Sequence, residues 1–210
     1  MGLSLSRAFS EVEAMAQKAA RGAGYAWGLA DEAAFAVGWL ERHGQGGCAV
    51  LAAWLLETDH LDLPDCAPNS QTDWRASSGR LCPIQTGAAL SDAAFALKGQ
   101  TITFDTLAHP ILVLPFVAHT ARIQASVIQF QGPFGSAKTD GTNLLMSDAP
   151  QQDTILIPCD DTLPKTKTTT RADPDPKDWR ILKRYASRTY APATDASRLT
   201  GAGAGLTDND

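Results

Sequence analysis

The residues best suited to bind a ligand lie near the end of the sequence, where arginines flank a glycine-rich stretch. Arginine binds carboxylates and phosphates through paired hydrogen bonds, and glycines let backbone N–H groups converge on an anion. An earlier arginine precedes a second glycine-containing insert, residues 22–28, and we expect it to line the same cleft. The predicted anion-binding residues are Arg21, Arg188, Arg198, Gly201, Gly203 and Gly205.

Proton transfer and metal binding have fewer candidates. His119 titrates near neutral pH and Tyr190 carries a phenol, so both are candidate catalytic groups, although a histidine after an apolar run is more often only hydrogen-bonded. Asp208 and Asp210 are candidate ligands for a divalent cation, and otherwise no metal site is predicted. Alternatively the glycine-rich end is a mobile tail, because glycine loses the most conformational entropy on ordering.

No cofactor is predicted. A dinucleotide-binding turn requires G-x-G-x-x-G between a strand and a helix. After Gly22-x-Gly24 the third glycine position is Trp27, and after Gly201-x-Gly203 it is Leu206. Neither glycine group is followed by the Lys-Ser or Lys-Thr pair of a phosphate-binding loop. The expected ligand is therefore a free small molecule.

Composition limits the class of protein. The chain has 210 residues, 44% hydrophobic and 20% charged, with a net charge of −5. This balance is typical of a soluble domain and argues against nucleic-acid binding. The start of the chain lacks a secretion-signal pattern, the apolar run 111–118 is too short to span a bilayer, and the four cysteines form no C-x-x-C pair. We expect a cytoplasmic protein with no membrane contact.

Hydrophobic periodicity predicts helices in residues 1–99, with residues 58–80 as a long surface connection. From residue 100 to 158 the runs TITF, ILVLPFV, RIQASVIQF, NLLMS and TILI predict strands, with Pro115 at an edge or a bulge. Residues 159–175 form a polar, proline-punctuated arm. Residues 176–210 supply a helix, capped by Asp175-Pro176, and the glycine-rich tail.

The predicted fold is therefore a single α+β domain spanning residues 1–210. Its helical N-terminal half packs on a small, mostly antiparallel sheet, and the C-terminal helix and tail follow.

Three segments together resemble a known family. ARGAGYAWGLADEAAFAVGWL near the start, PILVLPFVAHTAR in the middle and RTYAPATDASRLTGAGAGLTDND at the end are similar to bacterial proteins of about this length that are classed as a domain of unknown function. The resemblance implies a stand-alone bacterial cytosolic protein. It implies no activity, cofactor or catalytic residue.

Two functions of different class fit these features. The first is recognition of a small anionic metabolite, with or without catalysis, by the arginines and glycine amides. The second is a non-catalytic accessory or assembly subunit that docks on a protein partner through the basic C-terminal arm, and a third possibility is a purely structural homo-oligomer with no ligand. Ordering of the final residues beside the arginines would favour the first function.

Overall fold

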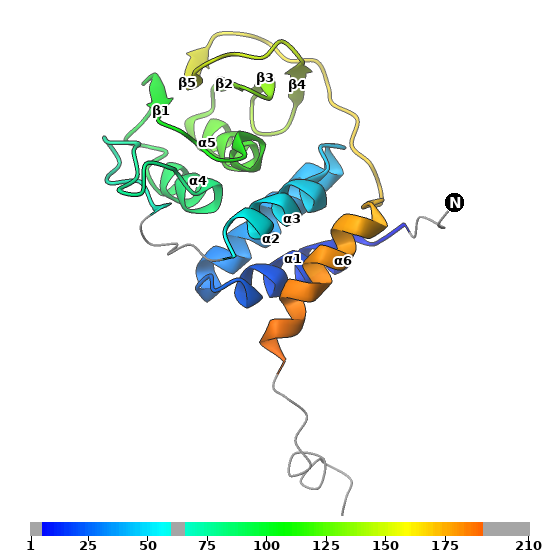
Figure 1. The fold of residues 1–210 in the computed structure, drawn as a ribbon. Helices are drawn as coiled ribbons and strands as arrows, with labels where there is room; N and C mark the ends of the chain where they lie inside the picture. Colours follow the sequence, from blue (N-terminus) through cyan, green and yellow to red (C-terminus); the bar gives the residue numbers. More distant parts are fainter. Residues whose placement is uncertain (1–5, 60–65, 191–210) are drawn as a thin grey trace, which may run out of the picture.

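The computed structural model describes residues 6–59 and 66–190, which form six α-helices and one five-stranded sheet (Figure 1). The helices are α1 (Phe9–Gly22), α2 (Trp27–Arg42), α3 (Gly47–Glu57), α4 (Pro83–Asp92), α5 (Leu114–Gln124) and α6 (Pro176–Ala186), with short 3-10 helices η2 (Pro110–Val113) and η3 (Ser187–Thr189). The strands are β1 (Ile102–Phe104), β2 (Val127–Gly132), β3 (Gly135–Thr139), β4 (Leu144–Ser147) and β5 (Thr154–Cys159). All neighbouring strands are antiparallel, in the order β1-β5-β2-β3-β4. The α+β prediction is confirmed.

Helices α1, α2, α3 and α6 form one packed layer. Small buried residues such as Ala16 and Ala19 let α1 approach its neighbours closely, while Trp179 and Leu182 of α6 enter the same core. The closest approach is at Gly22, where an added Cβ would lie 1.8 Å from the carbonyl oxygen of Tyr185. The end of α1 and the end of α6 are therefore in backbone contact.

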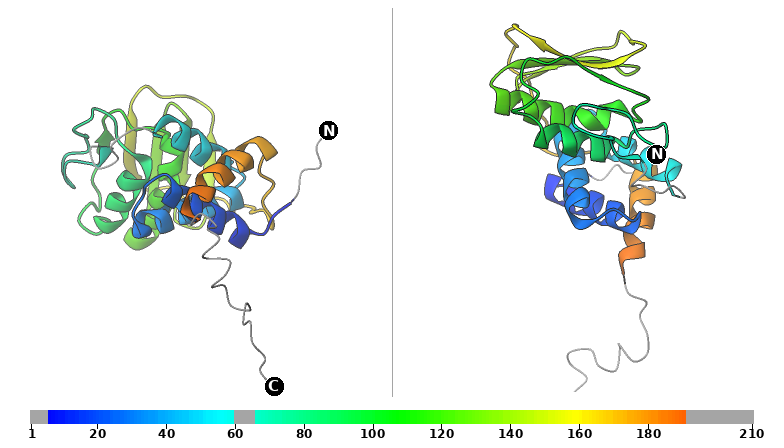
Figure 2. Two further views of the ribbon diagram at one scale, coloured as in Figure 1. Left: turned by 60° about the horizontal axis from the view of Figure 1, so that its bottom comes forward. Right: turned by 90° about the vertical axis from the view of Figure 1, so that its left-hand side faces the viewer.

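Helices α4 and α5 lie between the sheet and the layer formed by α1, α2, α3 and α6 (Figures 1 and 2). Phe130 and Ile128 of β2 lie in a second core with Leu114 and Val117 of α5. Strand residues alternate between buried and half-buried along β3, so one face of the sheet meets the helices and the other faces outward. The molecule thus has three layers, with α4 and α5 in the middle.

The polar arm, residues 159–175, runs from β5 back to α6 (Figure 1). The Thr166 hydroxyl donates to the Leu144 carbonyl at 3.0 Å, and the Thr169 N–H donates to the Arg42 carbonyl at 2.8 Å. Ala172 forms an antiparallel bridge with Arg7. Cys159 still belongs to β5, and the contacts of the following residues tie the arm to the sheet, α2 and the N-terminal segment.

The prediction of a strand at residues 111–117 is wrong. The segment forms η2 and the start of α5, and Pro115 lies in the first turn of the helix, where a missing N–H costs nothing. Residues 112–118 are all buried, so the sequence has no polar positions to reveal the 3.6-residue period. The next predicted strand begins five residues later than expected, at Val127, because α5 continues to Gln124.

The remaining differences concern element ends and one short strand. Helix α2 begins at Trp27, within the glycine-containing insert, and α4 ends at Asp92 rather than at residue 97. Strand β3 was not predicted, because its residues are small or polar. None of the helices in the described part of the chain has the length and apolar character that a membrane span requires.

Candidate functional site

A cationic hollow of about 470 Å³ lies where the end of α1, the start of α2 and η3 meet, and we call it the basic hollow. Among the described residues, its lining carries three cationic side chains and no carboxylate. The residues that give it this character are Lys18, Arg21, Gly22, Trp27, Arg188 and Tyr190. The structure thus places Arg21, Gly22, Gly24 and Trp27 around the same hollow as Arg188 and Tyr190.

Arg188 is held in a fixed position. Its two terminal nitrogens donate to the two carboxylate oxygens of Asp59, with 2.9 Å for the Nη2–Oδ2 bond. Its guanidinium carbon lies 4.3 Å from the centre of the Tyr185 ring. A bidentate ion pair and a cation–π contact together restrict the side chain. Because Asp59 neutralises much of its charge, Arg188 contributes geometry and donors more than net positive potential.

Arg21 and Lys18 provide the less compensated charge. The guanidinium of Arg21 donates to the Tyr25 carbonyl oxygen and lies 4.5 Å from the centre of the Trp27 ring. Its other N–H groups donate to no described residue, and a guanidinium has five in all. Lys18 is exposed and has no ionic partner among the described residues. Both side chains remain able to bind an anion.

Two aromatic rings border the hollow and are open to solvent. The Trp27 side chain is 65% exposed and Tyr190 is 63% exposed, which is unusual for rings of this size. Exposed rings beside cations suit a ligand that has both a charged group and a flat or apolar part. The rings therefore extend the basic hollow beyond a simple ion site.

A buried hydrogen-bond network supports the insert that carries Trp27. The indole N–H of Trp54 donates to the Tyr25 hydroxyl at 2.6 Å, and that hydroxyl lies 3.3 Å from the sulfur of Cys82. Burial raises the pKa of the Tyr25 phenol far above its usual value and that of the Cys82 thiol to about 11. Both groups are therefore neutral near pH 7, and the network positions the insert without supplying a nucleophile.

His119 lies elsewhere. It belongs to α5, not to a strand end, and lines a separate hollow of about 340 Å³ with Glu32 and Phe35. Arg122 Nη2 lies 3.1 Å from its Nδ1. Burial, and then the charge of Arg122, lower the pKa of His119, so the imidazole is neutral near pH 7. The structure does not bring His119 to the basic hollow, so it cannot act on a ligand bound there.

The remaining predicted residues cannot be placed. Arg198, Gly201, Gly203 and Gly205, and the candidate metal ligands Asp208 and Asp210, lie outside the described residues. Among residues 6–59 and 66–190, no group of three or more His, Cys, Asp or Glu side chains is arranged to hold a metal ion.

Comparison with known proteins finds one family model that matches part of the chain. Residues 7–82 match the family model described as a protein of unknown function (DUF3726). This confirms the resemblance to an uncharacterised family for α1, α2, α3 and the connection that follows, a stretch that contains Lys18, Arg21 and Trp27. No curated protein and no solved structure matches the chain significantly.

Sequence reasoning missed Lys18 and Trp27. Lys18 precedes Arg21 by three residues on a helix, a spacing that places both side chains on one face, so this signal was available. Trp27 stood in the quoted insert, but its exposure depends on the path of the chain between α1 and α2. Neither the ion pair of Arg188 with Asp59 nor its stacking on Tyr185 has a signal in the sequence.

Proposed function

We propose that the protein is a bacterial cytoplasmic protein that binds a small anionic metabolite, a carboxylate or a phosphate, in the basic hollow. One observation carries the proposal: three cationic side chains from two distant parts of the sequence surround one hollow, and no carboxylate from residues 6–59 or 66–190 lines it. Such a lining attracts anions and repels cations. The two exposed rings favour a ligand with a flat or apolar portion over inorganic phosphate alone.

The hollow offers an anion two kinds of hydrogen-bond donor, a guanidinium held in place and a lysine ammonium. Arg188 is prearranged by Asp59 and Tyr185, which reduces the conformational entropy lost on binding. Lys18 adds a mobile ammonium that can follow the ligand. Arg198 and the amides of Gly201, Gly203 and Gly205 remain part of the proposal from the sequence. The catalytic role of Tyr190 stays a prediction.

A thermal-shift screen followed by calorimetry tests the proposal. Carboxylates and phosphates with and without aromatic rings are added to the full chain, and a binder at a hundredfold excess over its Kd stabilises by about 2.7 kcal/mol. Lys18→Ala and Arg21→Ala are each expected to weaken binding roughly tenfold, as for a lost charged hydrogen bond. Lys98→Ala, an exposed lysine outside the hollow, is the matched control.

The outcomes separate clearly. Stabilisation by an anion that the Lys18 and Arg21 variants lose and the Lys98 variant keeps supports the proposal. If no carboxylate or phosphate stabilises the protein, or if all three variants bind alike, the hollow is not the anion site. Arg198→Ala in the same assay decides whether the glycine-rich end takes part.

Docking of a protein partner is the second candidate. The outer face of α6 exposes the basic residues Arg180, Lys183 and Arg184, while Trp179 and Leu182 face the core. A stoichiometric complex from source cells that dissociates on Arg180→Glu with Lys183→Glu, while anion binding is retained, would favour this function. A purified chain that forms no such complex would oppose it.

A further inference from the structure

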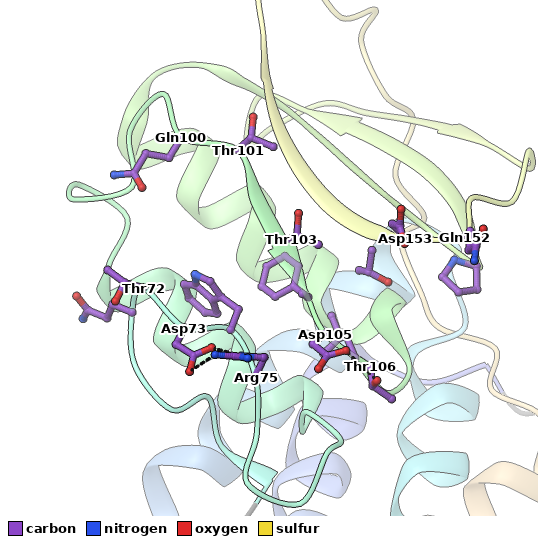
Figure 3. Close-up of a pocket in the computed structure, with 16 residues that line it drawn as sticks. Thr72, Asp73, Arg75, Gln100, Thr101, Thr103, Asp105, Thr106, Gln152 and Asp153 are labelled. Carbon is purple, nitrogen blue, oxygen red and sulfur yellow. Dashed lines mark hydrogen bonds and ion pairs between the residues drawn. The ribbon is translucent and has the colours of Figure 1, made fainter.

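A second hollow of about 810 Å³ lies at the opposite, sheet-bearing side of the molecule, and we call it the polar groove. It is bounded by residues 71–75, by β1 with the residues that flank it, and by the start of β5 (Figure 3). In Figure 3 the Asp73–Arg75 pair lies on one side, Asp153 on the other, and Thr103 between them. These three segments, together with Pro133 between β2 and β3, therefore form this surface.

The charge of the polar groove is opposite to that of the basic hollow. Its lining carries three carboxylates and a single arginine, and Arg75 Nε is paired with Asp73 Oδ1 at 2.6 Å. Asp153 has no ionic partner among the described residues, and the Asp105 carboxylate accepts a hydrogen bond from the Thr106 hydroxyl at 3.2 Å. A surface with this excess of carboxylates repels anions, so the groove is not a second anion site.

Two nearly buried side chains in the lining lack hydrogen-bond partners. Trp74 is 6% exposed and Thr154 is 7% exposed, and both line the groove. Neither the Trp74 indole N–H nor the Thr154 hydroxyl is hydrogen-bonded to any described residue. Neither atom is among the fully buried polar atoms that lack a partner, so both remain open to solvent and can bond to a molecule that replaces water there. The Trp74 indole can therefore donate a hydrogen bond to a molecule in the groove, and the Thr154 hydroxyl can both donate and accept one.

The groove does not suit an added peptide strand, although β1 is the edge strand of the sheet. The Asp105 N–H donates to the Trp74 carbonyl at 3.1 Å, and the Leu81 N–H donates to the Thr106 carbonyl at 3.1 Å. These bonds place the segment containing residues 74–81 beside the residues that follow β1, so the free edge is limited to the three residues of β1. Pairing by strand addition needs a free row of backbone groups, so a small molecule fits the groove better.

We propose that the polar groove binds a neutral, polyhydroxylated small molecule of the size of a mono- or disaccharide. Carboxylates accept hydrogen bonds from neighbouring hydroxyls, whereas glutamine amides and threonine hydroxyls both donate and accept. Gln100, Gln152 and Thr103 supply these groups around the two carboxylates not paired with an arginine. The Trp74 and Phe104 rings, 5.3 Å apart, form an apolar floor for ring C–H groups. The volume lies within the range of small-molecule sites.

Titration followed by NMR tests this assignment on the full chain. Glucose, galactose, mannose and maltose are titrated into the ¹⁵N-labelled protein, and the Trp74 indole signal is identified by its loss in Trp74→Phe. We expect one of these sugars to shift that signal. Asp153→Asn, at an exposed position, is expected to weaken binding about tenfold, as for a hydrogen bond to a charged group. Asp148→Asn, an exposed aspartate outside the groove, is the control.

Each outcome decides the question. A sugar that moves the Trp74 indole signal, with weaker binding in Asp153→Asn and unchanged binding in Asp148→Asn, supports the proposal. The proposal is overturned if none of the four sugars moves that signal, or if glucosamine or spermidine moves it and the neutral sugars do not, since that identifies a cation site. The test is independent of the basic hollow, because anion binding can be present or absent in either case.

Discussion

The basic hollow and the polar groove differ in charge and also in the kind of structure that holds them. In the hollow, helix backbones in direct contact fix the positions of Arg21 and Arg188. In the groove, a connection, a short edge strand and a loop form the lining, and most of its polar side chains are exposed. Close backbone packing leaves little room for change, whereas exposed segments tolerate substitution. Similar substitutions should therefore destabilise the first region more than the second.

The largest effect is expected from Gly22→Ala. The added Cβ would overlap the Tyr185 carbonyl oxygen, so α1 and α6 must move apart and the free energy of unfolding should fall by about 1–3 kcal/mol. Urea denaturation monitored by circular dichroism measures the change. Gly28→Ala is the control, because no atom lies within 4 Å of its added Cβ and it belongs to helix α2. Equal stability of the two variants would refute the close contact.

A smaller effect should distinguish the two arginine–aspartate pairs. Arg188→Gln removes a bidentate pair that joins η3 to the end of α3, and with side chains 42% and 22% exposed this should cost at most about 1 kcal/mol. Arg75→Gln breaks a more exposed pair within one loop, with side chains 67% and 32% exposed, and should leave the denaturation midpoint unchanged. If Arg75→Gln lost more stability than Arg188→Gln, substitutions would destabilise the polar groove more than the basic hollow, contrary to our expectation.

The smallest effect is a pH dependence near the boundary of the two regions. The pKa of His119 is lowered by burial and by Arg122 from 6.5, so below that pH the unfolded chain binds a proton that the folded chain does not. Stability should therefore fall as the pH drops through 6.5 and stop falling from this cause below the lowered pKa. His119→Gln should lose less stability between about pH 7.5 and about pH 5.5 than the parent chain. An equal loss of stability in the two proteins would contradict the lowered pKa of His119.

Much of the fold follows from local sequence signals. Asp175-Pro176 predicts the start of α6, and the Asp175 carboxylate indeed accepts from the Lys177 N–H at 2.6 Å. The runs TITF, NLLMS and TILI are strands, as their β-branched and aliphatic residues indicate. The strand prediction for the run ILVLPFV was wrong, because a helix that is buried on all sides has the same composition as a buried strand. Whether such a run forms a helix or a strand depends on the length of the element and on the residues that flank it, and not on the hydrophobic pattern.

The candidate site was predictable in part. Residue types identified Arg21 and Arg188, because a guanidinium beside glycines is a local signal for anion binding. Lys18 required helical spacing to be applied to the site as well as to the core. The polar groove had no signal, since Asp73, Asp105 and Asp153 come together only through the path of the chain around β1. Long-range assembly of this kind cannot be read from spacing.

The bridge between Arg7 and Ala172 has a consequence for biosynthesis. Val12 and Ala16 of α1 share their core with Leu182 of α6, so α1 cannot finish burying its apolar face until the distal arm and α6 have been translated. A nascent chain halted before α6 would present that unfinished surface to chaperones and proteases.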